Sequence, residues 1–122
     1  MALAVQNIAF DCDDAFTVAT FWSEVLGLPL DDEDNPGDPV ASIRRPGGPT
    51  FYYEHVPEPK TVKNRVHVCL QAGTDRDAEC ERVLGLGATV VGDHRREDGG
   101  GWVVFADPEG NEFCVLGRRS GT

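Results

Sequence analysis

The size, composition and charge of the chain fit a globular protein and exclude several function classes. The sequence has 122 residues, 40% hydrophobic and 26% charged, a balance typical of a folded domain. Its net charge of −10 argues against a nucleic-acid partner, because a phosphate backbone is bound by a positive surface. No apolar run approaches the roughly 18 residues of a membrane span, and the N-terminus does not read as an export signal. We therefore expect a cytoplasmic protein that binds neither nucleic acid nor membrane.

In the first half, periodicity predicts one helix among several strands. Alternating apolar residues indicate a strand over residues 3–12. Asp13 and Asp14 offer an N-cap for a helix over residues 15–26, and Gly27 closes that helix. An acidic loop with proline and glycine follows, and we interpret it as a solvated hairpin tip. The remaining strands of this half are expected at residues 28–30, 40–44 and 50–55.

The second half repeats this order. Thr74 or Asp75 caps a helix that is expected to run to Leu84. Residues 107–110, Asp-Pro-Glu-Gly, have the composition of a tight turn. The strands of this half are expected at residues 65–70, 88–91, 102–106 and 111–116.

The two halves also share sequence. Residues 23–28, Ser-Glu-Val-Leu-Gly-Leu, are echoed by residues 81–86, Glu-Arg-Val-Leu-Gly-Leu, and such self-similarity indicates a structural repeat. We predict a single α+β domain, residues 1–122, made of two βαβββ modules that form a curved mixed sheet with helices outside and a cup inside. The modules are residues 1–56 and 62–118, joined by a linker at 57–61.

The four cysteines do not form a metal-binding motif. They are Cys12, Cys69, Cys80 and Cys114, and no two form a Cys-x-x-Cys pair. Without an export signal, we expect four reduced thiols and no structural zinc site.

Two segments carry a resemblance to a known family. The helix end at residues 21–28, Phe-Trp-Ser-Glu-Val-Leu-Gly-Leu, and residues 105–113, Phe-Ala-Asp-Pro-Glu-Gly-Asn-Glu-Phe, resemble the vicinal oxygen chelate superfamily. That superfamily contains glyoxalase I, bleomycin-resistance proteins, fosfomycin-resistance enzymes and extradiol dioxygenases. The resemblance covers nearly the whole chain and marks a fold that hosts several chemistries.

The resemblance implies where a metal ligand would lie on the first strand of each module. Metal-dependent members place His or Glu there, facing into the cup. In the second module this position falls on His67, which matches. In the first module it falls on Asn7, or on Gln6 if the register slips by one residue, and an amide is a poor substitute for these ligands.

The last strand of each module departs further from that pattern. Tyr52 stands at the ligand position of the first module, with Glu54 on the same face. Cys114 stands where the resemblance implies a glutamate, with Glu112 on the same face. His67 is thus the only normal ligand type in place, and we expect no metal cofactor, with a divalent metal (Ni, Zn, Fe or Mn) as the alternative.

Charged and aromatic residues define the predicted ligand site. Lys63 and Arg65 alternate with His67 on one strand face and would suit a carboxylate or phosphate. The alternative interpretation is an edge strand protected by charge. Tyr52 and Trp102 are expected to line the cup.

Two function classes remain open. The first is a metal-free binding protein of the bleomycin-resistance kind, which holds an amphiphilic or anionic metabolite or drug in the cup. The second is a metal-dependent lyase, isomerase or dioxygenase that acts on a small oxygenated metabolite, with His67 and Glu112 as catalytic residues. The resemblance and an open sheet edge also predict a homodimer.

Overall fold

The computed structural model describes residues 2–117; residue 1 and residues 118–122, which include the predicted end of the second module, lie outside the described part. The chain divides into two compact units, Met1–Pro59 and Lys60–Thr122. The boundary between the units falls inside the predicted linker. No helix within the described range is long and apolar enough to cross a membrane.

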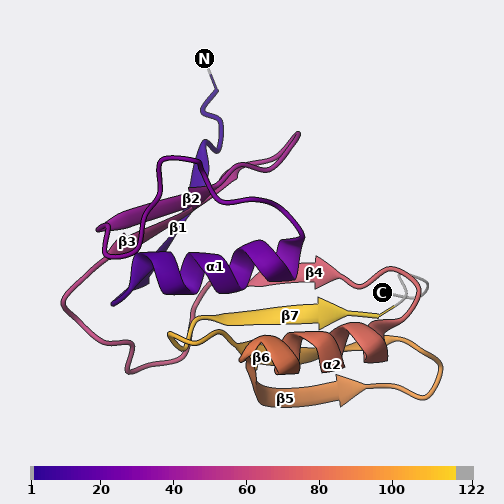
Figure 1. Ribbon diagram of the computed structural model, residues 1–122. Helices are drawn as coiled ribbons and strands as arrows, with labels where there is room; N and C mark the ends of the chain where they lie inside the picture. The colour runs from indigo at the N-terminus through magenta and orange to yellow at the C-terminus, as the bar shows by residue number, and fades with distance from the viewer. Residues whose placement is uncertain (1, 118–122) are drawn as a thin grey trace. The chain divides into compact units, whose positions relative to one another are not determined.

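The first unit is a three-stranded sheet with one helix (Figure 1). The strand order is β1-β3-β2, with β1 parallel and β2 antiparallel to β3. Helix α1 and strand β3 form over the residues predicted for them. The elements are β1 (Asn7–Cys12), α1 (Ala15–Leu26), β2 (Val40–Ile43) and β3 (Thr50–His55).

The strand expected at residues 28–30 does not form. Pro29 has no N–H group to donate to a ladder, and the loop that follows is tied to β2 by single contacts instead. The backbone N–H of Asp31 donates to the carbonyl of Ser42 at 3.1 Å. The backbone N–H of Ser42 donates to the carboxylate of Asp34 at 2.8 Å. The acidic loop is therefore anchored on β2 rather than built as a hairpin arm.

Helix α1 covers one face of this sheet. The Asp14 carboxylate accepts from the backbone N–H of Thr17 at 3.2 Å, and Gly27 ends the helix with φ of 67°. Trp22 is fully buried and its ring lies 5.3 Å from Phe10. Since strand residues alternate between faces, the neighbours of Phe10 on β1 belong to the opposite, open face.

The second unit is a four-stranded sheet with one helix (Figure 1). The strand order is β4-β7-β6-β5; β4 is parallel to β7, and the other pairs are antiparallel. Its first strand begins at Val68 rather than at the predicted Arg65, and β5 extends to Arg95 rather than ending at Val91. The elements are β4 (Val68–Gln71), α2 (Arg76–Leu86), β5 (Thr89–Arg95), β6 (Gly101–Ala106) and β7 (Glu112–Leu116).

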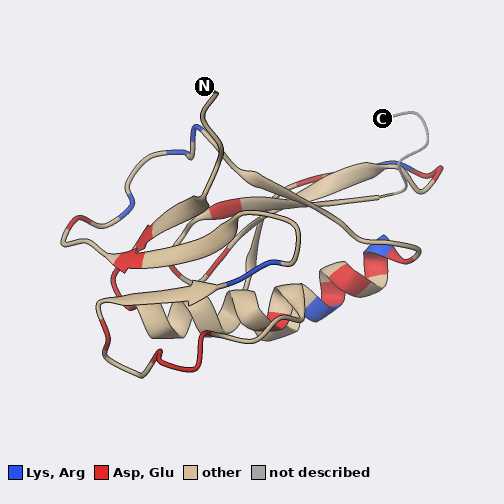
Figure 2. Ribbon diagram, turned by 90° about the horizontal axis from the view of Figure 1, so that it is seen from above, with Lys and Arg blue, Asp and Glu red and all other residues tan. Residues whose placement is uncertain are grey.

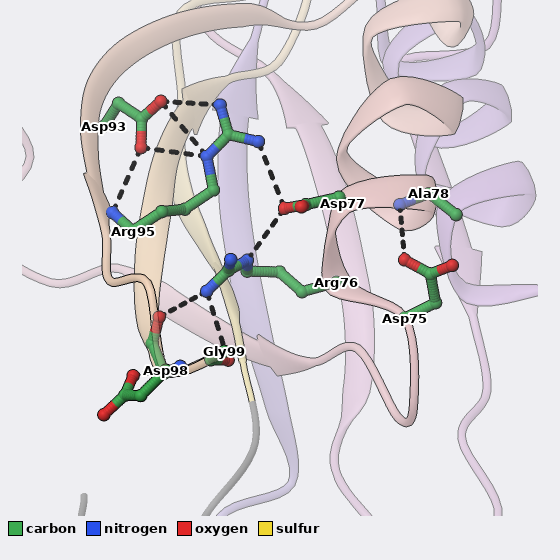
Figure 3. Close-up of polar contacts among 9 residues, drawn as sticks. Asp75, Arg76, Asp77, Ala78, Asp93, Arg95, Asp98 and Gly99 are labelled. Atoms are coloured by element: carbon green, nitrogen blue, oxygen red, sulfur yellow. Dashed lines mark hydrogen bonds and ion pairs between the residues drawn. The ribbon is translucent and has the colours of Figure 1, made fainter.

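Helix α2 buries Cys80 and Val83 and also makes ion pairs to its surroundings. Acidic and basic residues follow one another along it, whereas α1 carries a single charged residue (Figure 2). Asp77 accepts from Arg76 at 3.1 Å and from Arg95 of β5 at 3.2 Å, and Arg76 also donates to the carbonyl of Gly99 at 3.2 Å (Figure 3). The guanidinium of Arg95 lowers the pKa of Asp93 to about 2. This network fixes the start of α2 against β5 and the glycine turn.

The expected fold class is confirmed. Both units combine a mixed sheet with one helix on one face, so the chain is α+β. In each unit the helix leaves the other sheet face uncovered by its own secondary structure. The candidate site lies on that face of the second unit.

Candidate functional site on the open sheet face of the second unit

The strands of the second unit separate an apolar helix side from a more polar open side. Val103 and Phe105 are fully buried on the side of α2. Trp102 and Val104 alternate with them and point to the other side. In the register of β6 and β7, Trp102 faces Leu116 and Val104 faces Cys114. The open face therefore presents a tryptophan and aliphatic groups next to a thiol.

A small pocket of about 240 Å³ occupies this open face. It is smaller than the pockets of roughly 300 Å³ and above that enclose drug-sized ligands, so alone it fits a small molecule or one end of a larger one. Its lining combines apolar groups with a few polar ones: Lys63, His67, Cys69, Trp102, Val104, Glu112, Cys114 and Leu116.

Glu112 is a buried carboxylate held by the segment before β4. Its oxygens lie 3.5 Å from the ammonium of Lys60 and 3.4 Å from that of Lys63. The backbone N–H of Asn64 donates to it at 3.4 Å. Burial acts to raise the pKa of Glu112, but the Asn64 N–H and the Lys63 ammonium outweigh it, and the pKa is lowered overall. Glu112 is thus charged at neutral pH and already engaged.

Three potential metal donors gather at one end of the pocket. The side-chain donor atoms of His67, Cys69 and Cys114 all lie within 4.8 Å of one another. His67 and Cys69 are exposed, whereas Cys114 is 3% exposed. Burial, with the neighbouring Cys69 thiol, raises the pKa of Cys114 to about 11. Cys114 is therefore a neutral thiol at pH 7 as long as no cation is bound beside it.

Most residues predicted for the second module lie at this pocket, and one does not. Lys63, His67, Trp102, Glu112 and Cys114 all line it. Arg65 is exposed and is not part of the lining. The alternation that placed Lys63, Arg65 and His67 on one strand face is not realised, because the strand starts only at Val68.

Sequence reasoning missed Cys69, Val104 and Leu116. Val104 and Leu116 could have been found from strand alternation, because they follow Trp102 and Cys114 by two residues and lie on the same face of their strands. Cys69 lies on β4, directly opposite Cys114 in the register of β4 and β7.

The residues predicted for the first module lie together on the open face of the first unit. In the parallel register of β1 and β3, Asn7 faces Thr50, and Tyr52 and Glu54 follow on the same face. In the same register Glu54 lies opposite Asp11 of β1. Asp11 is a second carboxylate on this face, and the sequence analysis did not single it out. This face is thus polar and acidic.

Comparison with known proteins decides the family. A model of the glyoxalase-like domain matches residues 7–116, which is nearly the whole chain. The chain belongs to the glyoxalase-like domain family. The resemblance to the vicinal oxygen chelate superfamily is thereby confirmed. A search of curated proteins found no match for this glyoxalase-like protein.

Solved structures share the fold of this glyoxalase-like protein while differing in their named activities. Oxidase ChaP-H2 is 24% identical, with a TM-score of 0.71 and coverage of 100% of this chain and 98% of the other. Lactoylglutathione lyase from Agrobacterium tumefaciens is 23% identical, with a TM-score of 0.64 and coverage of 94% and 93%. The fosfomycin resistance protein FosX from Listeria monocytogenes, complexed with Mn(II) and a dihydroxypropylphosphonic acid, is 16% identical, with a TM-score of 0.73 and coverage of 95% and 90%. At these identities the similarity shows the fold alone.

Proposed function

We propose that this glyoxalase-like protein binds a small amphiphilic anion on the open face of its second unit. The observation that carries the proposal is the pocket in which Trp102, Val104 and Leu116 lie beside Lys63 and His67. An apolar surface with a few charged groups at its edge is the usual composition of a small-molecule site. The apolar groups would hold a ring or alkyl part, and the cationic edge would hold a carboxylate or phosphate.

The balance of charge at the pocket favours an anion. Glu112 is a single carboxylate, and both Lys60 and Lys63 lie against it. One positive charge therefore remains uncompensated in this group. The Lys63 side chain is 76% exposed, so its ammonium is able to turn from Glu112 to a ligand without burying an unpaired charge.

Tryptophan fluorescence offers a direct test. The chain has two tryptophans, of which Trp22 is fully buried and Trp102 is 38% exposed in the pocket. Titration with a panel of aromatic carboxylates should change the emission of Trp102 and raise the melting temperature. The Trp102→Phe variant should lose the emission change, because only Trp22 remains. If no panel member shifts either signal in the unmodified protein, the proposal fails.

A metal-dependent lyase, isomerase or dioxygenase is the second candidate, and the cluster of His67, Cys69 and Cys114 favours it. These donors differ from the His and Glu set that the family resemblance implies. One imidazole and two thiols suit Zn²⁺, which takes nitrogen and sulfur ligands, better than Mn²⁺, which prefers oxygen. Because zinc has no redox chemistry, this donor set favours the lyase or isomerase over the dioxygenase. A bound zinc ion would supply Lewis-acid polarisation of a substrate oxygen. His67, Cys69 and Cys114 would hold it, and Lys63 would orient an anionic substrate beside it.

We also infer a homodimer. The strand β5 forms an edge of its sheet, and Val90 and Val91 on it are 51% and 55% exposed. An apolar edge strand gains from pairing with another chain. Light scattering coupled to size exclusion at several protein concentrations tests this; a constant monomer mass would contradict it.

A further inference from the structure

Cys69 and Cys114 occupy directly paired positions on two neighbouring strands. The parallel register of β4 and β7 sets Cys69 opposite Cys114, and both side chains belong to the open face. Adjacent strands lie about 4.8 Å apart, which is inside the Cα separation of roughly 4.4–6.8 Å that a disulfide spans. Their sulfur atoms lie within 4.8 Å of each other. Rotation of the Cys69 side chain is the motion that would bring the two sulfurs into bonding distance.

The two thiols differ in accessibility in the way that an attacking and a resolving cysteine differ. Cys69 is exposed to solvent, and Cys114 is 3% exposed beneath it. Cys12 and Cys80 are both buried on other elements, Cys12 on β1 of the first unit and Cys80 on α2. Among the described cysteines, an oxidant in solvent therefore meets Cys69 first, and the thiol paired with it in the strand register is Cys114.

We infer that Cys69 and Cys114 form a modification site for hydroperoxides, which converts the pair reversibly into an intramolecular disulfide. The Cys69 thiolate attacks the terminal peroxide oxygen and the O–O bond breaks, so that the sulfur becomes a sulfenic acid and the alkoxide or hydroxide that leaves takes a proton from solvent to give an alcohol or water. Cys114 then attacks the Cys69 sulfur, and the sulfenic hydroxyl leaves as water with the Cys114 proton. The peroxide is reduced by two electrons, and the two thiols are oxidised by two.

The position of the pair gives the reaction a consequence for the pocket. Both sulfurs belong to the pocket lining, and both are donors of the cluster with His67. A disulfide removes both sulfur donors at once and leaves His67 alone. The site would thus lose its capacity for a thiophilic metal under oxidising conditions and regain it on reduction. This inference rests on the thiol geometry and is independent of the proposed ligand.

The same geometry makes the disulfide easy to reduce. Side chains at paired positions of parallel strands point the same way, with Cβ atoms near the strand spacing of about 4.8 Å. Unstrained disulfides hold the Cβ atoms at roughly 3.5–4.5 Å. The bond would pull the strands together, and strained, accessible disulfides are the readily reduced ones. Reversal by a cellular dithiol is therefore expected.

Peptide mapping of the full-length protein tests the site without relying on any variant. The reduced, metal-free protein is treated with hydrogen peroxide, alkylated and digested under non-reducing conditions. The expected product is a crosslinked peptide that joins Cys69 to Cys114, lost again after dithiothreitol. A crosslink through Cys12 or Cys80, a crosslink between two chains, or Cys69 oxidised beyond sulfenic acid with Cys114 still alkylated, would each overturn the inference.

Two variants sharpen this result. Cys69→Ser changes an exposed side chain and should leave the fold intact; after peroxide, Cys114 should remain fully alkylatable. Cys80→Ala leaves both paired thiols in place, and the crosslink should form as in the unmodified protein. Loss of the crosslink in a folded Cys80→Ala variant, or protection of Cys114 in Cys69→Ser, would show that the pairing is wrong.

Discussion

Asn64 and Glu112 hold each other through two hydrogen bonds. The backbone N–H of Asn64 donates to the Glu112 carboxylate at 3.4 Å, and the backbone N–H of Glu112 donates to the side-chain oxygen of Asn64 at 3.3 Å. This exchange docks the segment before β4 onto the start of β7 and brings Lys63 to the pocket. The catalytic role of Glu112 stays a prediction; the contacts of this residue in the structure fix the segment before β4.

The first prediction concerns the charge of Glu112. Glu112→Gln keeps the shape of the side chain but removes the charge that faces Lys60, Lys63 and the Asn64 N–H. We expect a loss of about 1 kcal/mol in the free energy of unfolding at pH 7. Charge-assisted hydrogen bonds to the buried carboxylate contribute most of this stability, whereas the ion pair with the exposed Lys63 adds little. Urea denaturation measures the difference. An unchanged midpoint would show that the segment is held by other contacts.

A second prediction is that the difference in unfolding free energy between the unmodified protein and Glu112→Gln depends on pH. The pKa of Glu112 is lowered in the folded protein from its ordinary value of 4.5. A group with a lowered folded pKa stabilises the protein above its unfolded pKa and loses this contribution as pH falls through the folded pKa. The gap between the unmodified protein and Glu112→Gln should therefore shrink as pH drops below 4.5. A gap that stays constant down to pH 3 would contradict the assignment of the pKa shift to Glu112.

Lys63 and Arg65 provide a matched pair for the proposed anion site. Lys63 lines the pocket, whereas Arg65 is exposed outside it. Both substitutions to alanine remove one positive charge, so long-range electrostatics change equally. We expect Lys63→Ala to weaken binding of aromatic carboxylates by about 5- to 10-fold, as for loss of roughly 1 kcal/mol of charge-assisted bonding, and Arg65→Ala to weaken it less than 2-fold. Equal effects in a fluorescence titration would mean that only net charge matters.

The sequence predicted the elements well where local signals and burial agree. Helix α1 follows the expected bounds because its cap at Asp14, its glycine end at Gly27 and its apolar face all point to one answer. The strand predicted at residues 28–30 does not form, because Pro29 has no N–H group to donate to a neighbouring strand. The strand predicted at residues 65–70 does not include residues 65–67, because a contact distant in sequence holds the chain before them: Asn64 is hydrogen-bonded to Glu112.

The candidate site was predicted in part for a similar reason. The family pattern singled out His67 and Cys114, and the structure places both in the lining of one pocket, Cys114 on β7 and His67 just before β4. Arg65 was assigned to the site by strand alternation that does not extend to its position. Cys69 was missed because it matches no motif, and what brings it to the site is its position opposite Cys114 in the register of β4 and β7. Contacts between neighbouring strands require the register, which one sequence does not supply.

Zinc binding is the next prediction, and it separates the second candidate function from the first. If His67, Cys69 and Cys114 form a metal site, the reduced protein should bind one Zn²⁺ per chain, measured by metal analysis after purification without a His-tag or chelator. Binding should release the proton of Cys114 and grow stronger as pH rises, because this thiol is neutral at pH 7. His67→Ala and Cys69→Ser should each abolish stoichiometric zinc, and a protein that retains no zinc at all would remove the metal-dependent candidate.

The same His67→Ala variant should leave carboxylate binding within about 2-fold if the apolar surface and Lys63 carry the affinity. Trp102 fluorescence reports this binding in the zinc-free protein. Loss of carboxylate binding together with loss of zinc would indicate that the ligand binds through the metal, and the metal-free proposal would then be wrong.

Two glycines give a last prediction about the strand that supports Trp102. Gly101 opens β6 with φ of 83°, where an added Cβ would collide with the carbonyl oxygen of His94 and lie 3.0 Å from the backbone N of Arg96. The contacting atoms are backbone, so they do not yield as a side chain would. Left-handed backbone alone costs a residue with a Cβ about 1–2 kcal/mol, and the collision adds to it. We expect Gly101→Ala to lower the free energy of unfolding by about 2–4 kcal/mol.

Gly85 is the matched control, because it lies inside α2 with open space around its Cβ position. Gly85→Ala should stabilise the protein by roughly 0.5–1 kcal/mol through the higher helix propensity of alanine. Thermal and urea unfolding of both variants measure the opposite signs, and a Gly101→Ala protein as stable as the unmodified one would show that the β5–β6 turn adopts a different backbone.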